Sequence, residues 1–286
     1  MPKLLGSFIS FKSPHYLVGS VRDAVSIKAQ AFMIFLGAPH TALRVDPNRM
    51  QIDEGHTLME QHNLSKSGMV VHAPYIINCA SKDPVKQTFA IDVLTREVKL
   101  CHAVGAKLIV LHPGSAVEQT QTQALDHLIK VLNTVIANTK EVIICLETMA
   151  GKGNEIGRDL DQLKYVINHI EQQERIGVCL DTCHFHDSGN DFNNTAEIME
   201  TIDTKLGFEF LKVIHLNESK NVCGSKKDRH ANLGEGMIGF DNLMRFIAQP
   251  QIKQIPIVLE TPSDKHNYPA VYGAEIERIR AWFGAR

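Results

Sequence analysis

The stretch KLIVLHPGSAVEQTQTQALDHLIKVLNTVIANTKEVIICLE, residues Lys107–Glu147, contains the repeating unit of this chain. It begins with a short apolar run, Lys107–His112, and ends with a second, Val142–Glu147. Both runs are too short for helices, and polar, Gly or Pro residues bound them, which is typical of buried strands. Between them, apolar residues recur at helical spacing: Leu125, Leu128, Ile129, Leu132 and Val135. The stretch therefore predicts a strand, a helix and a second strand, the second parallel to the first.

The same alternation extends over the whole chain. Further strand-like runs occupy Lys3–Ile9, Ala31–Leu36, Met69–Ala73, Ile176–Asp181, Lys212–Leu216 and Pro256–Glu260. Helical spacing recurs in three more sets, Ala90/Leu94/Val98/Cys101, Leu160/Leu163/Val166/Ile167/Ile170 and Ile198/Ile202/Leu206. Eight strands separated by helices predict a (β/α)₈ TIM barrel, and an open doubly wound sheet is the alternative with the same alternation.

Length and composition agree with one barrel. The chain has 286 residues and no linker or low-complexity stretch, and α/β barrels commonly form one domain of about 250 residues, so we expect a single domain over residues 1–286. The formal net charge of −2 excludes nucleic-acid binding by bulk positive charge and leaves only local basic patches. No apolar run reaches the roughly 20 residues that a membrane span needs, and Met1–Ser10 lacks a signal-peptide pattern. The six cysteines are dispersed, mostly in apolar runs, so we expect reduced thiols and a cytoplasmic protein.

Ionisable side chains end six consecutive predicted strands. They are His72, His112, Glu147, Asp181, His215 and Glu260, and His184, Asp228 and His230 follow in the adjoining loops. In a barrel these side chains converge on one opening, where carboxylates need compensating positive charge. Metal ions supply it, and mixed His and carboxylate ligands suit Zn²⁺, with Mn²⁺ or Fe²⁺ as substitutes. Nine candidates exceed the needs of one tetrahedral ion and indicate two or three; a hydrogen-bonded polar ring without metal is the alternative.

Seven motifs, in this order, strongly resemble the endonuclease IV family: HAPYIIN, LHPGS, LETMAGKG, LDTCH, HLNESK, DRHANLGEG and LET. The resemblance extends from about Leu4 to Pro262. It implies a zinc-dependent apurinic/apyrimidinic endonuclease that acts on double-stranded DNA as a monomer, with its place in the cell at the nucleoid. The expected reaction is hydrolysis 5′ to an abasic site, which leaves a 3′-hydroxyl and a 5′-deoxyribose phosphate. Trimming of blocked 3′ ends is also implied.

The resemblance also implies which residues bind three zinc ions. His72, His112 and Glu147 match the ligands of the first ion, and Glu147 would bridge to a second ion bound by Asp181, His215 and Glu260. The third ion would take His184, Asp228 and His230. We expect the nucleophile to be activated between the first two ions, with Glu147 and Glu260 as the candidates for catalytic carboxylates.

Candidate DNA contacts lie in loops after the strands. Tyr75, with Ile76 beside it, matches the residue that fills the gap in the minor groove; ordinary loop packing is the alternative for Tyr75. The family's arginine wedge has no counterpart here, since its place falls nearest His40, with Arg44 further along. Phe8 is a second departure, because relatives commonly have His there.

Basic residues gather in the loop that carries the last two third-zinc ligands. Lys220, Lys226, Lys227 and Arg229 are placed to meet backbone phosphates if this loop lies on the active face. Elsewhere the same residues would be an ordinary solvated loop.

Two other functions remain open from the sequence. A divalent-metal sugar isomerase or epimerase uses the same barrel, but with one or two ions and no need for a wedge tyrosine. A damaged-DNA-binding protein with structural zinc would saturate its ions with protein ligands, whereas nine residues shared by three ions leave coordination positions open.

Overall fold

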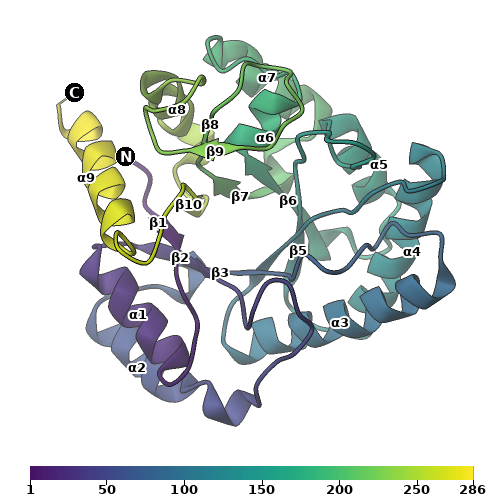
Figure 1. Cartoon of the computed structure of the whole chain (residues 1–286), viewed down its shortest axis with the longest axis horizontal. Coiled ribbons are helices and arrows are strands. Elements are labelled where there is room, and N and C mark those ends of the chain that lie inside the picture. The colour runs from purple at the N-terminus through teal and green to yellow at the C-terminus, as the bar shows by residue number, and fades with distance from the viewer. Residues whose placement is uncertain (286) are drawn as a thin grey trace.

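The computed structural model describes residues 1–285, and eight of its strands close into a parallel barrel (Figure 1). These strands are β1 (Leu5–Phe8), β2 (Ala31–Ile34), β3 (Met69–His72), β4 (Leu108–Leu111), β5 (Ile143–Glu147), β6 (Ile176–Asp181), β7 (Leu211–His215) and β10 (Ile257–Leu259). The first and last strands pair with each other, Leu5 opposite Ile257. This pairing closes the sheet, so the (β/α)₈ prediction is confirmed and the open doubly wound sheet is wrong.

Helices surround the barrel in the plan view of Figure 1. They are α1 (Tyr16–Ser26), α2 (Ile52–Gln61), α3 (Pro84–Ala103), α4 (Gln121–Ala137), α5 (Leu160–Asn168), α6 (Thr182–Asp187), α7 (Thr195–Lys205), α8 (Phe240–Ile247) and α9 (Ala270–Gly284). Short 3₁₀ turns occupy Pro47–Arg49, Lys66–Gly68, Gln173–Arg175, Phe208–Phe210 and Pro250–Ile252. The helices expected from apolar spacing correspond to α3, α4, α5 and α7.

Local sequence explains where the long helices begin. Asp83 accepts from the Val85 backbone N–H at the start of α3, and Pro84 occupies the first turn, where its missing donor costs nothing. Thr120 and Gln123 form a reciprocal capping box at the start of α4. These caps satisfy backbone N–H groups in the first turns, which have no partner within the helix.

Two apolar layers make the core. The inner layer fills the barrel with one residue from each of seven strands: Met33, Val70, Val110, Cys145, Cys179, Val213 and Val258. The outer layer packs the helices against the barrel wall. All six cysteines are free thiols, and only Cys223 is even partly exposed.

A small hairpin extends the loop after β7. Its strands are β8 (Glu218–Ser219) and β9 (His230–Ala231), which pair antiparallel and bring residues 220–229 out as a loop. Among the residues described, no helix is both long and apolar enough to cross a membrane.

Candidate metal centre

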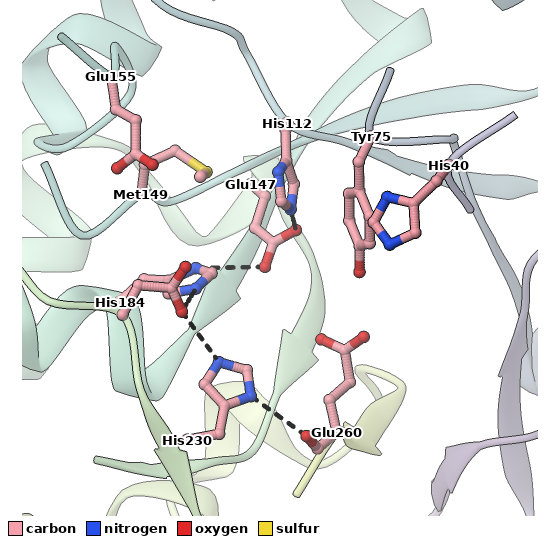
Figure 2. Close-up of a pocket in the computed structure, with 10 residues that line it drawn as sticks. His40, Tyr75, His112, Glu147, Met149, Glu155, His184, His230 and Glu260 are labelled. Carbon is pink, nitrogen blue, oxygen red and sulfur yellow. Dashed lines mark hydrogen bonds and ion pairs between the residues drawn. The ribbon is translucent and has the colours of Figure 1, made fainter. Parts of the chain in front are cut away.

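Side chains from the carboxyl ends of the strands converge on one cavity of about 480 Å³. Figure 2 shows His112, Glu147, His184, His230 and Glu260 directed toward the same space. Their chain positions explain the convergence, because His72, Glu147, Asp181 and His215 are the last residues of β3, β5, β6 and β7. His112 and Glu260 come directly after β4 and β10.

The first group of possible ligands consists of His72, His112 and Glu147. Oε2 of Glu147 lies 3.2 Å from Nε2 of His72 and 3.1 Å from Nε2 of His112. His72 and Glu147 are 1% exposed, whereas the His112 side chain is 29% exposed. The two imidazoles therefore meet one carboxylate oxygen, with His112 on the solvent side.

The second group shares Glu147 and adds Asp181, His215 and Glu260. Nδ1 of His215 lies 3.1 Å from Oε1 of Glu147 and 2.9 Å from Oε2 of Glu260. Since Oε2 of Glu147 faces the first group and Oε1 faces the second, this carboxylate has the orientation of a bridging ligand.

The third group consists of His184, Asp228 and His230. Nε2 of His184 is 3.0 Å from Oδ1 of Asp228, and Nε2 of His230 is 3.7 Å from the same oxygen. His184 comes from α6, while Asp228 and His230 come from the loop and second strand of the β8–β9 hairpin. In each group the ligand atoms lie within 4.8 Å of one another.

The hydrogen bonds of the imidazoles fit a cation. Nδ1 of His72 contacts the Ala73 carbonyl at 2.7 Å, and a carbonyl only accepts, so this nitrogen carries the proton. In the neutral ring, Nε2 then directs a lone pair at the Glu147 carboxylate. Nδ1 of His230 likewise donates to the Glu260 carbonyl at 3.1 Å, and its buried Nε2 has no hydrogen-bond partner among residues 1–285. Lone pairs aimed at carboxylates are the donor arrangement that a metal ion satisfies.

The electrostatics of the site favour ionised carboxylates. Burial opposes ionisation of Glu147, but the charges of His215 and His112 outweigh it and hold its pKa well below its ordinary value. Burial is likewise outweighed at Glu260 by His215 and at Asp228 by His184, and each of these carboxyls has its pKa lowered to about 2. Ionised carboxylates are the form that binds cations, so the donor set suits metal binding.

A fourth group includes a thiol, that of Cys183, for which the sequence favoured core packing over metal binding. Cys183 lies with Asp181 and His230 so that their donor atoms are within 4.8 Å of one another. Burial raises the pKa of the Cys183 thiol above its ordinary value. Because the thiolate is the form that binds metal ions, the raised pKa disfavours Cys183 as a ligand.

Two polar residues that sequence reasoning missed orient the ligands. Asn217 donates to Asp181 and accepts from the backbone N–H of Glu260. Asp187, the last residue of α6, accepts from the backbone N–H of Asp228 at 2.8 Å. Asn217 lies inside the HLNESK motif and Asp187 shortly after LDTCH. Their closeness in sequence to His215 and His184 was the only sign that they contact the metal ligands.

The aromatic residue Tyr75 stands over the first group. Its ring centroid is 4.9 Å from that of His112 and 5.2 Å from that of His72, yet 40% of the residue is exposed. Figure 2 shows His40 beside Tyr75, and their ring centroids are 5.6 Å apart. Ile76 follows at 36% exposed. Tyr75 thus packs on the site and also faces solvent, so both readings of this residue have support.

The basic residues of the hairpin loop lie beside the third group. Lys220, Lys226, Lys227 and Arg229 are all exposed, and the Lys220 backbone N–H donates to the Arg229 carbonyl across the hairpin. Arg229 donates to the carbonyl of Asp228 at 2.8 Å. The loop therefore carries its positive charges next to the cavity.

The two departures from the family pattern have different outcomes. Arg44 is not an exposed wedge, because its side chain is 2% exposed and pairs with Glu97. Phe8, at the end of β1, packs edge-on against Phe35 with ring centroids 5.8 Å apart. Phe35 in turn contacts His72. At position 8, where relatives commonly have a histidine that can donate a hydrogen bond, this chain therefore has apolar packing.

Comparison with known proteins identifies close relatives. A family model described as xylose isomerase-like TIM barrel matches residues 21–282. A "Probable endonuclease 4" from Mycoplasma genitalium is 66% identical over 99% of this chain and 97% of its own. Endonuclease IV from Thermus thermophilus superposes with a TM-score of 0.85 at 25% identity, covering 99% of this chain and 100% of that one. A D-tagatose 3-epimerase-like protein shares the fold, with a TM-score of 0.73 at 17% identity and coverage of 99% and 97%.

Proposed function

Because the chain belongs to the endonuclease 4 proteins of the xylose isomerase-like TIM barrels, we propose that it is a DNA repair nuclease that hydrolyses the phosphodiester 5′ to abasic sites. The products are a 3′-hydroxyl and a 5′-deoxyribose phosphate, and the same site trims blocked 3′ ends. The observation that carries the proposal is the presence of three ligand groups in one cavity, two of them sharing Glu147.

Three metal ions per chain match this donor set. His72, His112 and Glu147 would bind the first, Glu147, Asp181, His215 and Glu260 the second, and His184, Asp228 and His230 the third. The mixture of imidazole and carboxylate favours Zn²⁺, and Mn²⁺ or Fe²⁺ are compatible substitutes. When bound, such ions lower the pKa of water and stabilise charge on the attacking and leaving oxygens of a phosphodiester.

The chain's own residues orient the substrate and the ligands. Glu147 directs one oxygen to each of the first two groups and so fixes their separation. Glu260, 2.9 Å from His215, is the second carboxylate at the reacting phosphate and our other candidate for proton transfer. Hydrogen bonds from Nδ1 of His72 and His230 to backbone carbonyls orient each ring so that Nε2 faces the ligand group.

Duplex DNA with abasic or 3′-blocked damage is the proposed substrate. Tyr75 and Ile76 would fill the space left by the missing base, and His40 would contact the strand beside them. Lys220, Lys227 and Arg229 would bind backbone phosphates on the side of the third group. We propose a monomer that acts in the cytoplasm at the nucleoid, where its substrate lies.

The sugar isomerase alternative has little to support it. The D-tagatose 3-epimerase-like protein resembles this chain in fold at 17% identity, whereas the 66% identical relative carries the name of a probable endonuclease. His72, His112, Asp228 and His230 would also have no purpose in a one- or two-ion isomerase. No observation favours it as a second function.

The first experiment uses a duplex with one tetrahydrofuran abasic analogue, incubated with purified protein with and without chelator. The analogue cannot undergo β-elimination, so any cut is hydrolytic. We expect a cut that leaves a 3′-hydroxyl extendable by a polymerase, loss of cutting after chelation, and about three metal ions per chain by elemental analysis. Absence of cutting by protein that contains its metals would contradict the proposal. One ion per chain would contradict the three-ion assignment.

A further inference from the structure

Helix α9 holds the loop that follows the third ligand group. The backbone N–H of Leu233, three residues after His230, donates to Oε1 of Glu275 at 2.8 Å. The carbonyl of Leu233 accepts from Nη1 of Arg278 at 2.6 Å. Glu275 and Arg278 are neighbours on one face of the helix, because they are three residues apart. Both backbone polar groups of Leu233 are therefore bound by α9.

The same carboxylate binds the loop that starts at the second ligand group. Oε2 of Glu275 accepts from the hydroxyl of Thr261, which directly follows Glu260. One turn earlier on α9, the Tyr272 hydroxyl donates to the Thr261 carbonyl at 3.2 Å. The helix thus binds Thr261 through both its side chain and its backbone.

Glu275 is buried, and its hydrogen bonds go to these two loops. The residue is 7% exposed. Besides the bonds from Leu233 and Thr261, its Oε1 accepts from Nδ2 of Asn232 at 3.3 Å. A buried carboxylate costs free energy unless donors replace its hydration, and these three donors all belong to the loops. The charge is therefore best compensated when both loops are in place.

Direct contacts also join the two loops to each other. Nδ1 of His230 donates to the Glu260 carbonyl at 3.1 Å, and Nδ2 of Asn232 donates to the Pro262 carbonyl at 3.2 Å. Glu275 adds an anchor from outside the loops, since α9 packs against β1, the strand that pairs with β10 (Figure 1). The positions of His230 and Glu260 are thus fixed relative to the barrel wall as well as to each other.

We propose that Glu275 is a positioning residue of the metal centre, which holds Glu260 of the second ligand group and His230 of the third in the geometry that binds their ions. The inference rests on the metal assignment of the proposed function. Glu275 acts through the backbone that carries both ligands. Its removal should therefore weaken the binding of two of the three ions and leave the ion of the first group in place.

Three variants of Glu275 separate the length of the side chain from its charge. Glu275→Ala removes the acceptors for both loops. Glu275→Asp keeps the charge but is one methylene shorter, so it cannot bond to both loops at once. Glu275→Gln loses the charge and keeps the length, because its carbonyl can accept from Leu233 while its NH₂ donates to the Thr261 hydroxyl oxygen. If the geometry of the loops is what matters, Glu275→Gln should bind metal and Glu275→Asp should not.

Two other residues of α9 provide matched controls. Glu277→Gln makes the same chemical change at an exposed residue that pairs with Lys28. Ile276→Ala leaves a cavity at a fully buried core residue, so it lowers thermal stability without removing a hydrogen bond.

Metal retention is measured by elemental analysis after dialysis against buffers of graded free zinc concentration. We expect the wild type and both controls to retain about three ions per chain where Glu275→Ala and Glu275→Asp retain about one, which corresponds to an affinity loss of about tenfold or more at two groups. Glu275→Gln should stay within about threefold of the wild type. Cleavage by Glu275→Ala should recover as zinc is raised, because every ligand side chain is still present.

The outcomes separate this inference from the proposed function. If Glu275→Ala retains metal as well as the wild type does, the positioning role is wrong and the nuclease stands. Equal metal loss in Ile276→Ala, at a similar fall in melting temperature, would also overturn the role, because general stability would explain it. If the wild type binds three ions but does not cut the abasic duplex, the proposed nuclease falls, while metal retention still decides the role of Glu275.

A second variant keeps the test open if Glu275→Ala does not fold. Thr261→Val removes one hydroxyl and preserves the shape of the side chain, so it breaks the bond to Glu275 on the side of Glu260 alone. We expect it to lower zinc affinity at one group by about tenfold. Unchanged retention of all the ions in Thr261→Val would contradict the inference.

Discussion

Asn217 donates a hydrogen bond from Nδ2 to Oδ2 of Asp181 over 2.6 Å, with both side chains fully buried. The opposite atom of the same amide, Oδ1, accepts from the backbone N–H of Glu260 at 2.9 Å. One side chain thus connects two candidate ligands, Asp181 at the end of β6 and Glu260 directly after β10. The other carboxylate oxygen of Asp181, Oδ1, is not bound by Asn217 and accepts from the His184 backbone N–H at 2.8 Å.

Replacing this amide should weaken the second ligand group. Asn217→Ala leaves Oδ2 of Asp181 without its donor and releases the backbone of Glu260, so both carboxylates gain freedom that metal binding must remove. We expect about a 10- to 100-fold loss of affinity for the metal of that group, the usual effect of removing a group that orients ligands. Competition with a fluorescent zinc chelator measures it.

Asn242→Ala is the matched control. Asn242 is also a buried asparagine, 8% exposed, but it donates to Ile238 and Asn193, away from the metal centre. It should lower thermal stability without changing metal affinity. Equal losses of metal affinity in both variants would show that Asn217 acts through general stability.

The orientation of Glu147 between the first two ligand groups predicts that cleavage depends on both of its carboxylate oxygens. Glu147→Gln keeps the size of the side chain but replaces one carboxylate oxygen with an amide NH₂. The amide nitrogen has no lone pair to offer a metal ion, so the side chain can no longer bridge the first two groups. We expect cleavage of the abasic duplex to fall by at least about a thousandfold, in line with loss of metal-ion catalysis. Near-normal turnover would remove Glu147 from the mechanism.

Glu155→Gln makes the same chemical change in the same cavity. Glu155 lines the cavity, yet Oε2 accepts from the Lys152 backbone N–H, and the residue belongs to no ligand group among the described residues. We expect this variant to keep its metals and its kcat within about threefold, since loss of one partly exposed contact costs little.

Tyr75 separates DNA binding from metal binding. Tyr75→Ala removes a ring that is 40% exposed at the mouth of the cavity, so affinity for a tetrahydrofuran duplex should fall about tenfold or more. Metal content should remain intact because no ligand atom is lost. Tyr75→Phe keeps the ring contacts with His72 and His112 and should bind nearly as the wild type does. Unchanged affinity of Tyr75→Ala would leave Tyr75 as a packing residue only.

The alternation of apolar runs predicted parallel strands separated by helices, and the count of eight strands favoured the barrel over the open sheet. Buried parallel strands are short and apolar whatever their partners, and chirality and short connections leave few ways to arrange them. Five helices were not predicted, namely α1, α2, α6, α8 and α9, and α6 is the one whose sequence offered no pattern. All six residues of α6 are buried, so no polar face marks it as a helix, although it carries His184.

The ligand set could be predicted because each member ends a strand or belongs to a specific motif. The residues that orient the ligands could not, since their roles depend on contacts between distant loops. Arg44 illustrates the limit: it lies in the loop where a DNA contact was expected near His40, whereas its ion-pair partner, Glu97, lies on α3. The residues next to Arg44 and Glu97 in the sequence give no signal that the two side chains pair.

Asp187 connects α6 to the loop of the third group, and its replacement should release that loop. Its Oδ2 accepts from the backbone N–H of Asp228 at 2.8 Å and its Oδ1 from the Ser219 hydroxyl at 2.6 Å, while Lys226 and Asp228 on the loop have positive φ. Asp187→Ala removes both acceptors, so the backbone N–H of Asp228 and the Ser219 hydroxyl lose this partner. We expect loss of about one metal ion per chain and a 10- to 100-fold fall in cleavage, measured by elemental analysis and steady-state kinetics. Asp191→Ala, at an exposed aspartate that accepts from the Asn193 backbone N–H, should change neither, and loss of all metal in Asp187→Ala would mean that Asp187 supports the whole centre.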